Sequence, residues 1–542
     1  MTPAIRLAML GCFAWHALVP QVSTAAATAT APPADWARYV DPFIGTGEHG
    51  HTYPGATLPF GMVQLSPDTR LSGWDGCSGY HFSDSVIYGF SHTHLSGTGI
   101  PDYGDILFMP RTGKPRWKNG AGGPPGTGYG SSFDKSSERA EPGWYAVELT
   151  DMKIQVELTV TERAGFHRYR FPAGEPAHVL VDLAHRDSVL DAGLRIVSPS
   201  GIEGWRRSSA WARDQVVYFA ARFSRPFSRA TLATDDQPSL EMNELQGKSV
   251  KGIFAFGAEG GELLVKVGIS AVDIDGARRN LETELPGWNF EAVRYAARLR
   301  WDEALGRIET TGGTEEQRVV FYTALYHSLL APNLFSDVDG RYRGMDGAIH
   351  TAEDRRQYTV FSLWDTFRAA HPLYTLIEPE RAGEFVATFL AQAEQGGRLP
   401  VWELAGNETD CMIGYHSVSV IADAWSKGIG GFDAERALDA MVHTANLDHF
   451  GLDAYKRQGF IGGEDEPESV SKTLEYAYDD WCIAQMAAGL GRDDVAREFE
   501  WRSQGWRHLF DPETRFLRPR RNQRWLSPVS YTHLTLPTIL RV

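Results

Sequence analysis

The chain has little cysteine, a shortage of positive charge and no long apolar run after its first residues. Only 4 Cys occur among 542 residues, too few for a disulfide-stabilised scaffold. Cys411 and Cys482 could pair, but buried free thiols suit such sparse cysteines better. Lys and Arg number 53 against 69 Asp and Glu, which gives a net charge of -16. That balance argues against nucleic acid or an anionic membrane as a partner.

Motifs of several common enzyme classes are also missing. The sequence has no Gly-x-Ser-x-Gly elbow, no P-loop, no His-Glu-x-x-His motif and no Cys-x-x-Cys pair. These absences argue against an α/β-type serine hydrolase, a P-loop nucleotide hydrolase and a zinc-dependent protease of the zincin class. After the amino-terminal region, no segment is apolar over a length that predicts a transmembrane helix.

The first 30 residues have the pattern of an export signal. Arg6 supplies the positive charge, residues 7–22 are mostly apolar, and small residues follow from Ser23 onward. A lipoprotein cleavage site at Cys12 is a second possibility, although the apolar run before it is very short. We expect residues 1–30 to be a signal peptide and the protein to be periplasmic or extracellular.

The spacing of apolar residues divides the remaining chain into two regions. Residues 38–277 contain short alternating stretches, such as 144–150 and 156–162, which predict a β-sandwich. Over residues 285–526 the spacing becomes helical. Helices without strands between them predict an α/α toroid, and a superhelical stack is the alternative.

Two of the predicted helices carry clear signals. Thr314-Glu-Glu-Gln317 is a capping box for the helix that follows it. Residues 471–490 repeat apolar side chains every three or four positions, which places Trp481 on the buried face. Glu475 and Asp479 lie one turn apart on a polar stripe of the same helix. A solvated face is one interpretation of that stripe, and a sugar or Ca²⁺ site is the other.

Aromatic residues beside carboxylates point to carbohydrate chemistry. The chain has 16 Trp, and Trp364 directly precedes Asp365. An indole can cover a sugar ring while the carboxylate accepts its hydroxyls; a helix cap beside a core indole is the alternative. Glu408 follows Trp402 and Glu403 in a second such segment, where a solvated turn is the alternative. Glycoside hydrolysis requires one carboxylic acid and a second carboxylate.

Two His-x-His pairs occur, His49 with His51 and His92 with His94. On a strand this spacing places both rings on one face, where they can bind a transition metal. Hydrogen bonding within the fold or to sugar hydroxyls is the preferred interpretation, because the motif is short and common.

Long segments of the chain resemble glycoside hydrolase family 92. They include Val40-Asp-Pro-Phe-Ile-Gly-Thr-Gly-Glu-His-Gly-His-Thr-Tyr-Pro-Gly55, Gly73-Trp-Asp-Gly-Cys-Ser-Gly-Tyr80, Gly89-Phe-Ser-His-Thr-His-Leu-Ser-Gly-Thr-Gly99, Ser362-Leu-Trp-Asp-Thr-Phe-Arg368, Gly406-Asn-Glu-Thr409 and Ser469-Val-Ser-Lys-Thr-Leu-Glu-Tyr-Ala-Tyr-Asp-Asp-Trp481. Members of this family are mostly calcium-dependent, exo-acting α-mannosidases. The resemblance implies an amino-terminal β-sandwich packed on an (α/α)6 barrel, and cleavage of α-mannosides with inversion.

The resemblance also implies roles for particular residues. By motif, Trp364 and Asp365 match residues that hold the terminal mannose, and Trp74 matches the contribution of the sandwich to the cleft. Glu408 is expected near the sugar. Glu475 and Asp479 are the candidate ligands of the Ca²⁺ that contacts the sugar in this family.

The function implied is that of an α-1,2-mannosidase-type enzyme that removes terminal mannose from the N-glycans of glycoproteins. One alternative is another glycoprotein-glycan hydrolase, such as one that releases the glycan from asparagine. A second is a noncatalytic glycan-binding module. The oligomeric state is left open.

The sequence departs from the family pattern near its end. The family segments Glu-Gly-Asn-x-Trp-Gln-Tyr, with the general acid, and Gly-Asn-x-Asp-x-Gly-Gln-Met, with the general base, do not occur. The resemblance is expected to stop near Leu526, because residues 527–542 resemble translated adapter sequence rather than protein. We therefore expect a truncated sequence with an incomplete toroid, inactive and poorly soluble as written.

Overall fold

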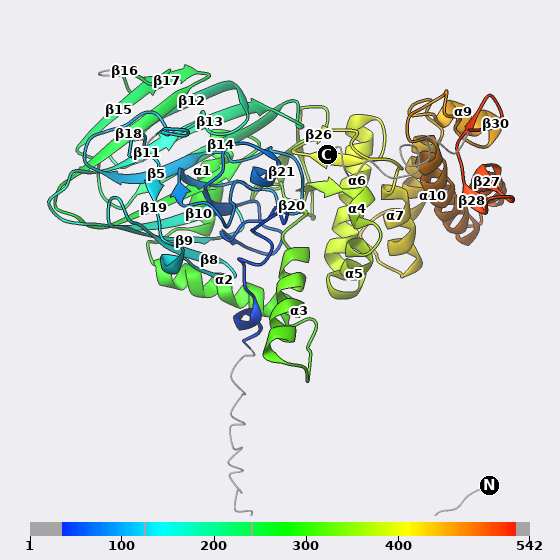
Figure 1. Cartoon of the computed structure of the whole chain (residues 1–542), viewed down its shortest axis with the longest axis horizontal. Coiled ribbons are helices and arrows are strands. Elements are labelled where there is room, and N and C mark those ends of the chain that lie inside the picture. The colour runs from blue at the N-terminus through cyan, green and yellow to red at the C-terminus, as the bar shows by residue number, and fades with distance from the viewer. Residues whose placement is uncertain (1–34, 124–125, 240–241, 527–542) are drawn as a thin grey trace, which may run out of the picture. The chain divides into compact units, whose positions relative to one another are not determined.

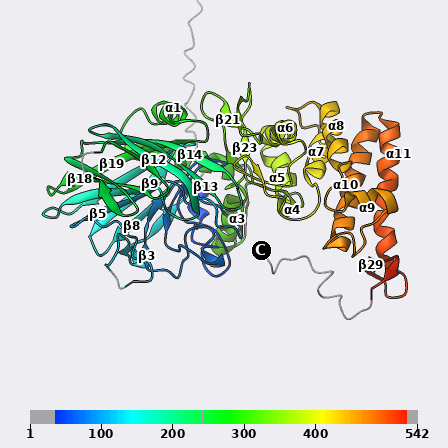
Figure 2. The same cartoon turned by 90° about the horizontal axis from the view of Figure 1, so that it is seen from above.

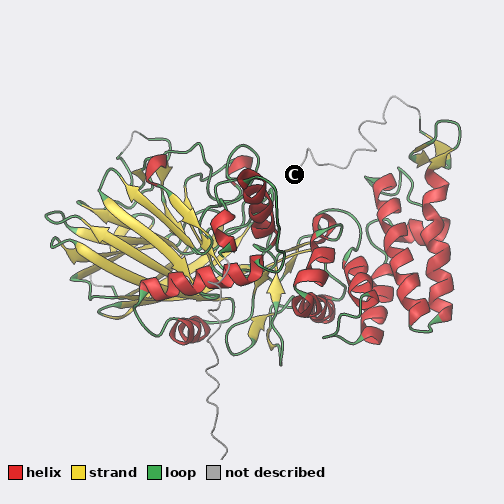
Figure 3. Ribbon diagram, turned by 90° about the horizontal axis from the view of Figure 1, so that it is seen from below, coloured by secondary structure: helices red, strands yellow, loops and turns green. Residues whose placement is uncertain are grey.

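The computed structural model describes residues 35–123, 126–239 and 242–526. The predicted signal peptide at 1–30, with Cys12, and the predicted artefactual tail at 527–542 lie outside these described residues. Strands dominate the described chain up to Ser270 and helices dominate the rest, as the colours of Figure 3 show. The predicted order of a β-rich domain and a helical domain is confirmed. Closure of the helices into a toroid stays a prediction.

Two antiparallel sheets form the sandwich (Figure 1). Within the described residues the first sheet contains β1 (Ala56–Thr57), β2 (Gln64–Asp68), β4 (Gly89–Ser91), β5 (Leu107–Thr112), β11 (Ala177–Asp182), β18 (Val250–Gly257), β15 (Arg229–Thr234) and β16 (Gln237–Ser239), in spatial order. The second contains β17 (Glu244–Gly247), β12 (Ser188–Ser198), β13 (Gly201–Ser209), β14 (Gln215–Phe223), β19 (Gly261–Ser270), β10 (Ala164–Phe171), β9 (Ile154–Val160), β8 (Trp144–Leu149) and β7 (Arg139–Glu141). A small pair, β3 (Val86–Ile87) with β6 (Ser131–Ser132), joins two connecting loops.

Strand β10 shows how its sequence specifies a layered position. Tyr169 and Phe171 belong to the main core of the sandwich, whereas Phe166 packs on the opposite face of the strand against α1 (Ile274–Glu284). Successive side chains of a strand point to opposite faces, so both sets become buried. Arg170 is the one residue of β10 that is exposed.

A buried ion-pair network crosses the core of the sandwich. Arg206 on β13 is fully buried, and its guanidinium contacts Asp105 at 2.5 Å and also Asp187. Asp105 accepts further hydrogen bonds from Thr93 Oγ1 and Gln215 Nε2. Burial raises the pKa of Asp187, and the charge of Arg206 opposes that rise. Because buried charges are costly without their partners, the stability of the sandwich depends on Arg206.

The helical region contains short strands as well as helices. Its described helices are α1, α2 (Phe290–Leu305), α3 (Glu315–Ser328), α4 (Leu363–Thr366), α5 (Ala370–Ile377), α6 (Pro379–Gly396), α7 (Ser417–Ser426), α8 (Ala434–Ala445), α9 (Leu452–Gln458), α10 (Ser469–Gly489) and α11 (Asp493–Arg502). Its described strands are β20 (Asn333–Leu334), β21 (Arg341–Arg343), β22 (Ile349–Thr351), β23 (Tyr358–Thr359), β24 (Phe361–Ser362), β25 (Trp402–Leu404), β26 (Asn407–Glu408), β27 (Phe510–Asp511), β28 (Phe516–Leu517), β29 (Arg520–Arg521) and β30 (Arg524–Trp525). The 3-10 helices of the described chain are η1 (Trp36–Tyr39), η2 (Trp74–Gly76), η3 (Lys135–Ser137) and η4 (Ser503–Leu509). The expectation of helices without intervening strands was wrong, because several loops pair as two- or three-residue ladders.

The predicted capping box at the start of α3 is confirmed. Thr314 Oγ1 accepts from Gln317 N at 3.2 Å, and Gln317 Oε1 accepts from Thr314 N at 3.0 Å. These two bonds satisfy backbone donors that have no partner within the helix.

The predicted burial of Trp481 on α10 was wrong. Its side chain is 46% exposed, whereas Asp479 and Asp480 on the same helix are fully buried. The periodic pattern assumed that buried positions are apolar. Here two buried carboxylates have hydrogen-bond donors around them, so the buried face of α10 is rotated away from Trp481.

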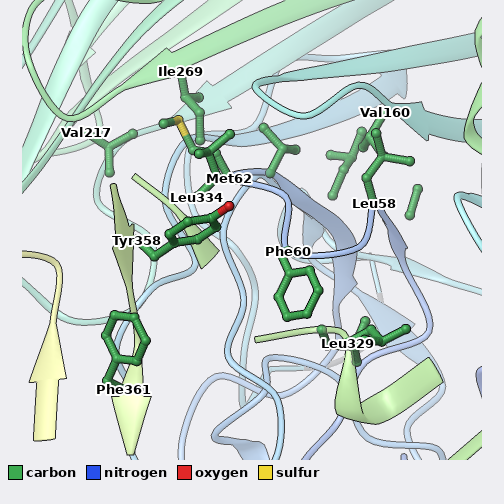
Figure 4. Packing of buried hydrophobic residues seen from close by; sticks show 14 of the residues in the cluster. Leu58, Phe60, Met62, Val160, Val217, Ile269, Leu329, Leu334, Tyr358 and Phe361 are labelled. Carbon is green, nitrogen blue, oxygen red and sulfur yellow. The ribbon is translucent and has the colours of Figure 1, made fainter. Parts of the chain in front are cut away.

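One hydrophobic core joins the sandwich to the helical region. The backbone N–H of Phe60 donates to Leu329 O at 3.0 Å, and its carbonyl accepts from Leu334 N at 2.8 Å. Its ring meets Tyr374 and Phe385 edge-on, with centroids 5.6 and 5.7 Å apart. Figure 4 shows Phe60 between the sandwich loops and the first helical residues. Both regions belong to one compact unit that begins at Trp36.

None of the helices in the described ranges combines the length and apolar character needed to cross a lipid bilayer. The cysteines within those ranges, Cys77, Cys411 and Cys482, are free thiols. The pairing considered for Cys411 and Cys482 is therefore not formed.

Candidate functional site

A pocket of about 380 Å³ lies where a sandwich loop meets the helical region. The sandwich contributes Trp211, from the turn between β13 and β14, and α4 contributes Trp364. The loop 410–415 forms another part of the wall, and α10 adds Lys472 and Tyr476. Figure 2 labels α4, α8 and α10, the helices that contribute residues to the pocket wall. Two indoles on separate elements of one concave site give apolar surface of the kind that sugar rings cover.

The predicted sugar-binding pair lies at the start of α4. Trp364 is half-buried, lines the pocket and donates Nε1–H to Glu475 Oε1 at 3.2 Å. Asp365 is exposed and accepts from Ser362 Oγ at 2.5 Å. The alternative of a cap residue beside a core indole does not describe this geometry, because Ser362 is the N-cap and Trp364 faces the pocket.

Three residues of the pocket wall have a left-handed backbone. Asp410, Met412 and Glu468 all line the pocket, and all have positive φ values of 55°, 72° and 55°. Val360, shortly before Trp364, has φ of 68°, which is unusual for a β-branched residue. Strained non-glycine residues of this kind cluster at functional sites. The strain therefore supports the pocket as the candidate site.

Glu408 supports the wall of the pocket through the backbone. Its Oε2 accepts from Val401 N at 2.8 Å, and its Oε1 accepts from the N–H groups of Trp402 and Asp410 at 2.9 Å each. The carboxylate thus fixes the start of the 410–415 loop. Contact of Glu408 with a sugar stays a prediction.

Glu475 and Asp479 bind protein donors. Asp479 accepts from Tyr415 N at 2.9 Å and lies 3.0 Å from His416 Nδ1. Glu475 lies 3.3 Å from His416 Nε2 and accepts from Arg368 NH2 at 2.9 Å. Burial lowers the pKa of His416, but the two carboxylates outweigh it and raise that pKa to about 9. Burial raises the pKa of Glu475, but His416 and Arg368 outweigh it and lower that pKa.

This geometry does not fit a Ca²⁺ site at Glu475 and Asp479. Calcium takes six to eight oxygen ligands, whereas the oxygens of these two carboxylates face N–H donors, including a positively charged Arg368. Within the described ranges, no group of three or more His, Cys, Asp or Glu side chains is arranged to hold a metal ion. The polar stripe in the sequence of this helix does not reveal these N–H donors, because they belong to segments that are distant along the chain.

The loop around Trp74 forms a separate polar and aromatic cluster on the sandwich. Trp74 is 46% exposed, with the rings of His51 and His49 4.2 and 5.1 Å away. His49 Nδ1 pairs with Asp75 at 2.6 Å, and His51 Nδ1 lies 3.0 Å from Thr98 O. Trp74 is not among the residues that line the pocket described above. Its predicted contact with substrate stays a prediction.

The second His-x-His pair is buried in the sandwich. His92 Nδ1 lies 2.7 Å from Ile106 O, and His94 Nδ1 lies 2.8 Å from Gln64 O. Hydrogen bonding within the fold, the preferred interpretation of this motif, is what the structure shows for these two rings.

A reciprocal amide pair connects the two regions near the pocket. Asp214 N donates to Asn407 Oδ1 at 3.2 Å, and Asn407 Nδ2 donates to Asp214 O at 3.2 Å. Asp214 lies three residues after Trp211, and Asn407 lies three residues before Asp410. The bonds therefore join two segments that each carry a residue of the pocket wall, Trp211 and Asp410.

Sequence reasoning missed several pocket residues. Trp211 lies in a turn with no motif, and its place in the same pocket as Trp364 depends on packing between distant segments. Lys472 is buried, and its Nζ lies 2.9 Å from Glu466. A lysine on the buried face of a helix could have indicated this position from the sequence. Arg398 pairs with Asp410, a contact that no sequence spacing indicates.

Glu403, beside the predicted segment, provides a prediction about pH. It is fully buried, and burial raises the pKa of its carboxyl to about 8, although Gly406 N and Thr359 Oγ1 donate to it. Since the raised pKa favours the protonated folded form, its contribution to stability is complete below the unfolded pKa of about 4.5 and is lost as pH rises towards 8.

We expect Glu403→Gln to flatten this dependence by up to about 1.4 kcal/mol per pH unit between pH 5 and 8. Urea unfolding at several pH values measures it. Glu394→Gln is the control, because Glu394 is an exposed carboxylate. Parallel profiles for Glu403→Gln and the unmodified chain would contradict the expectation.

Two family models together match most of the chain. One, described as the glycosyl hydrolase family 92 N-terminal domain, matches residues 39–270. The other, described as the glycosyl hydrolase family 92 catalytic domain, matches residues 276–535. The second match runs past Leu526, where the resemblance was expected to stop, and its last residues lie outside the described ranges.

Solved structures give the same picture. The family GH92 alpha-mannosidase BT3965 from Bacteroides thetaiotaomicron is 40% identical, with 91% of this chain and 68% of that chain covered and a TM-score of 0.88. It has also been solved in complex with mannoimidazole. The family GH92 inverting mannosidase BT2199 from Bacteroides thetaiotaomicron VPI-5482 is 30% identical, with 92% and 68% covered and a TM-score of 0.84.

Among curated proteins, an uncharacterized secreted glycosidase from Arthroderma benhamiae is 28% identical over 531 residues. The similarity covers 88% of this chain and 62% of the relative. The chain therefore spans less than two thirds of that relative's length.

Proposed function

Since the chain belongs to glycosyl hydrolase family 92, we propose that it is an exported α-mannosidase that removes terminal α-linked mannose from glycoprotein N-glycans. The observation that carries the proposal is the pocket between Trp211 and Trp364, in a chain with family matches on both sides of it. An exo-acting enzyme needs a concave site of limited size for one terminal sugar.

The residues of the pocket can bind and orient a sugar. Trp364 lines the pocket and offers an indole face, and Asp365, the next residue, is exposed but is not among the lining residues. In the proposed mode the ring packs on Trp364, and its hydroxyls donate to Asp365. Holding a substrate in a reactive orientation supplies a large share of the rate enhancement of enzymes.

The proposed reaction proceeds with inversion at the anomeric carbon. It requires a carboxylic acid that protonates the leaving oxygen and a carboxylate that activates water on the opposite face, about 6.5–9.5 Å apart. BT2199, one of the similar proteins, is described as an inverting mannosidase. We assign neither the acid nor the base to any of the described residues. The role proposed for the described pocket residues is to bind the sugar.

Calcium is the cofactor implied by the family. Because Glu475 and Asp479 bind protein donors, no step of this proposal passes through a metal at these residues. Dialysis of the protein against a chelator, followed by return of Ca²⁺, measures whether turnover needs the ion.

Export is part of the proposal. The apolar, small-residue pattern of residues 1–30 supports it, as does the description of the Arthroderma benhamiae relative as secreted. We propose a periplasmic or extracellular location, where glycoprotein glycans are accessible.

Product analysis tests the proposal. The full chain is incubated with a high-mannose glycoprotein, and the released sugars are separated and examined by proton NMR. Turnover by this chain would overturn the expectation of inactivity stated in the sequence analysis, which arises because the family segments with the acid and base do not occur in it. Where turnover is found, we expect free mannose whose first-formed anomer is β. Release of the whole glycan would favour an amidase-type enzyme. Mannoside binding without turnover would favour a glycan-binding module when it is seen in a chain that contains the family's acid and base segments, and either result would overturn the proposal.

A further inference from the structure

His416 is buried between two carboxylates, one on each side of its ring. Its Nδ1 lies 3.0 Å from Asp479 Oδ1, and its Nε2 lies 3.3 Å from Glu475 Oε2. The ring stacks on Phe367, with centroids 3.9 Å apart and planes 10° apart. Nδ1 is hydrogen-bonded to Asp479, whereas Nε2 faces Glu475 as an ion pair without hydrogen-bond geometry. A doubly protonated imidazole can therefore attract both carboxylates, which lie one turn apart on α10.

The network extends from His416 to the pocket wall at Trp364. Glu475 accepts the indole N–H of Trp364 at 3.2 Å and an N–H of Arg368 at 2.9 Å. The indole N–H is the only polar group of the Trp364 side chain. It donates to Glu475, and the other carboxylate oxygen of Glu475 faces His416. Charge-assisted bonds of this kind are stronger than neutral ones.

The same network reaches the 410–415 loop, which also lines the pocket. Asp479 Oδ2 accepts from Tyr415 N at 2.9 Å, and Asp480 Oδ1 accepts from Tyr415 Oη at 2.8 Å. Gly414 has φ of 84°, and a Cβ there would lie 2.4 Å from His416 Nε2. The loop therefore follows the imidazole closely, and only glycine fits at this point.

We propose that His416 is a positioning residue that fixes Trp364 and the Gly414–Tyr415 loop relative to each other, and thereby sets the width of the sugar pocket. The proposal rests on the proposed function for its ligand, a terminal mannose-type sugar. It also gives Glu475 and Asp479 a role that needs no metal, since both are attachment points of this brace.

Removal of the imidazole should alter Trp364 before it alters the fold. In His416→Gln the amide is neutral and donates from a single nitrogen, so it no longer attracts Glu475 and Asp479 from two separate nitrogens of one ring. Glu475 remains paired with Arg368, but the orientation of its side chain on α10 is then free to change. The indole should lose its fixed orientation, and binding should weaken more than the chemical step.

The test combines a spectroscopic measurement with a binding measurement on the full chain. Tryptophan is replaced by 5-fluorotryptophan, and Trp364→Phe identifies the fluorine resonance of Trp364. We expect that resonance to shift or broaden in His416→Gln. We also expect the dissociation constant for mannoimidazole and KM for a mannoside to rise about tenfold, with kcat changed less than about threefold.

Two further variants complete the design. Glu475→Gln keeps an acceptor for the indole but removes the charge that faces His416, and it should move the same resonance if His416→Gln fails to fold. His350→Gln is the matched control, because His350 lies 3.0 Å from Asp346 Oδ1 in a more exposed pair outside this pocket. The control should leave the Trp364 resonance and the dissociation constant unchanged.

The outcomes separate the two proposals. A Trp364 resonance that stays in place in both variants overturns the positioning role. A moved resonance with unchanged mannoimidazole binding and KM also overturns it, because His416 is then structural only. If the resonance moves but the unmodified chain neither binds mannoimidazole nor cleaves mannosides, the brace is supported and the α-mannosidase proposal fails.

Discussion

Replacement of Trp364 by alanine is expected to lower kcat/KM for α-mannosides by about 10² or more. The indole lines the pocket and is held by Glu475, so its loss removes both an apolar face and a fixed boundary of the site. The expected effect includes weaker binding of mannoimidazole. Steady-state kinetics and calorimetry measure the two quantities separately.

The control for this substitution is Trp501→Ala. Trp501 lies on α11, is 66% exposed and does not line the pocket. Its removal should leave kcat/KM within about twofold of the unmodified chain. A Trp364→Ala variant with unchanged kcat/KM and unchanged unfolding would show that this pocket is not the sugar site.

Replacement of Arg206 by methionine is expected to destabilise the sandwich by about 3–5 kcal/mol. Methionine fills part of the volume, but Asp105 and Asp187 remain buried without their guanidinium. Breaking a buried ion pair from one side costs more than removing the whole pair, because an uncompensated charge stays behind. Denaturant unfolding of the purified variant measures the loss.

The neighbouring residue provides a matched control. Arg207 pairs with Asp214, and both side chains are about half exposed. Arg207→Met should therefore cost only about 0–1 kcal/mol. Adding Asp105→Asn and Asp187→Asn to Arg206→Met should recover part of the lost stability. Equal losses for the Arg206 and Arg207 variants would mean that burial of the network is not what matters.

The order of domains was predictable because it depends on local periodicity. Alternating segments such as 156–162 and the capping box at Thr314 encode their structure within a few residues. The burial of Trp481 was not predictable in the same way, because its helix buries charged residues whose donors come from far along the chain.

The candidate site was predictable only in part. Trp364 was found because an indole beside a carboxylate is a local signal, and the structure places it in a pocket. Trp211 and His416 were missed because their importance depends on neighbours more than 60 residues away, such as Asp479 for His416. Glu475 and Asp479 were noticed for their charge, but a one-dimensional pattern does not show which donors surround a carboxylate.

The mutual amide bonds between Asp214 and Asn407 have a consequence for how a ligand is admitted. They join a hairpin turn of one lobe to a ladder of the other, beside a continuous core. Hydrogen bonds of this kind oppose hinge motion between the two lobes. We therefore expect the pocket to have the same shape before and after a ligand binds. Such preorganisation lowers the entropy cost of ligand binding, because the pocket walls are already ordered. The protein would then discriminate among sugars by how well each one fits the rigid pocket, rather than by closing around the bound sugar.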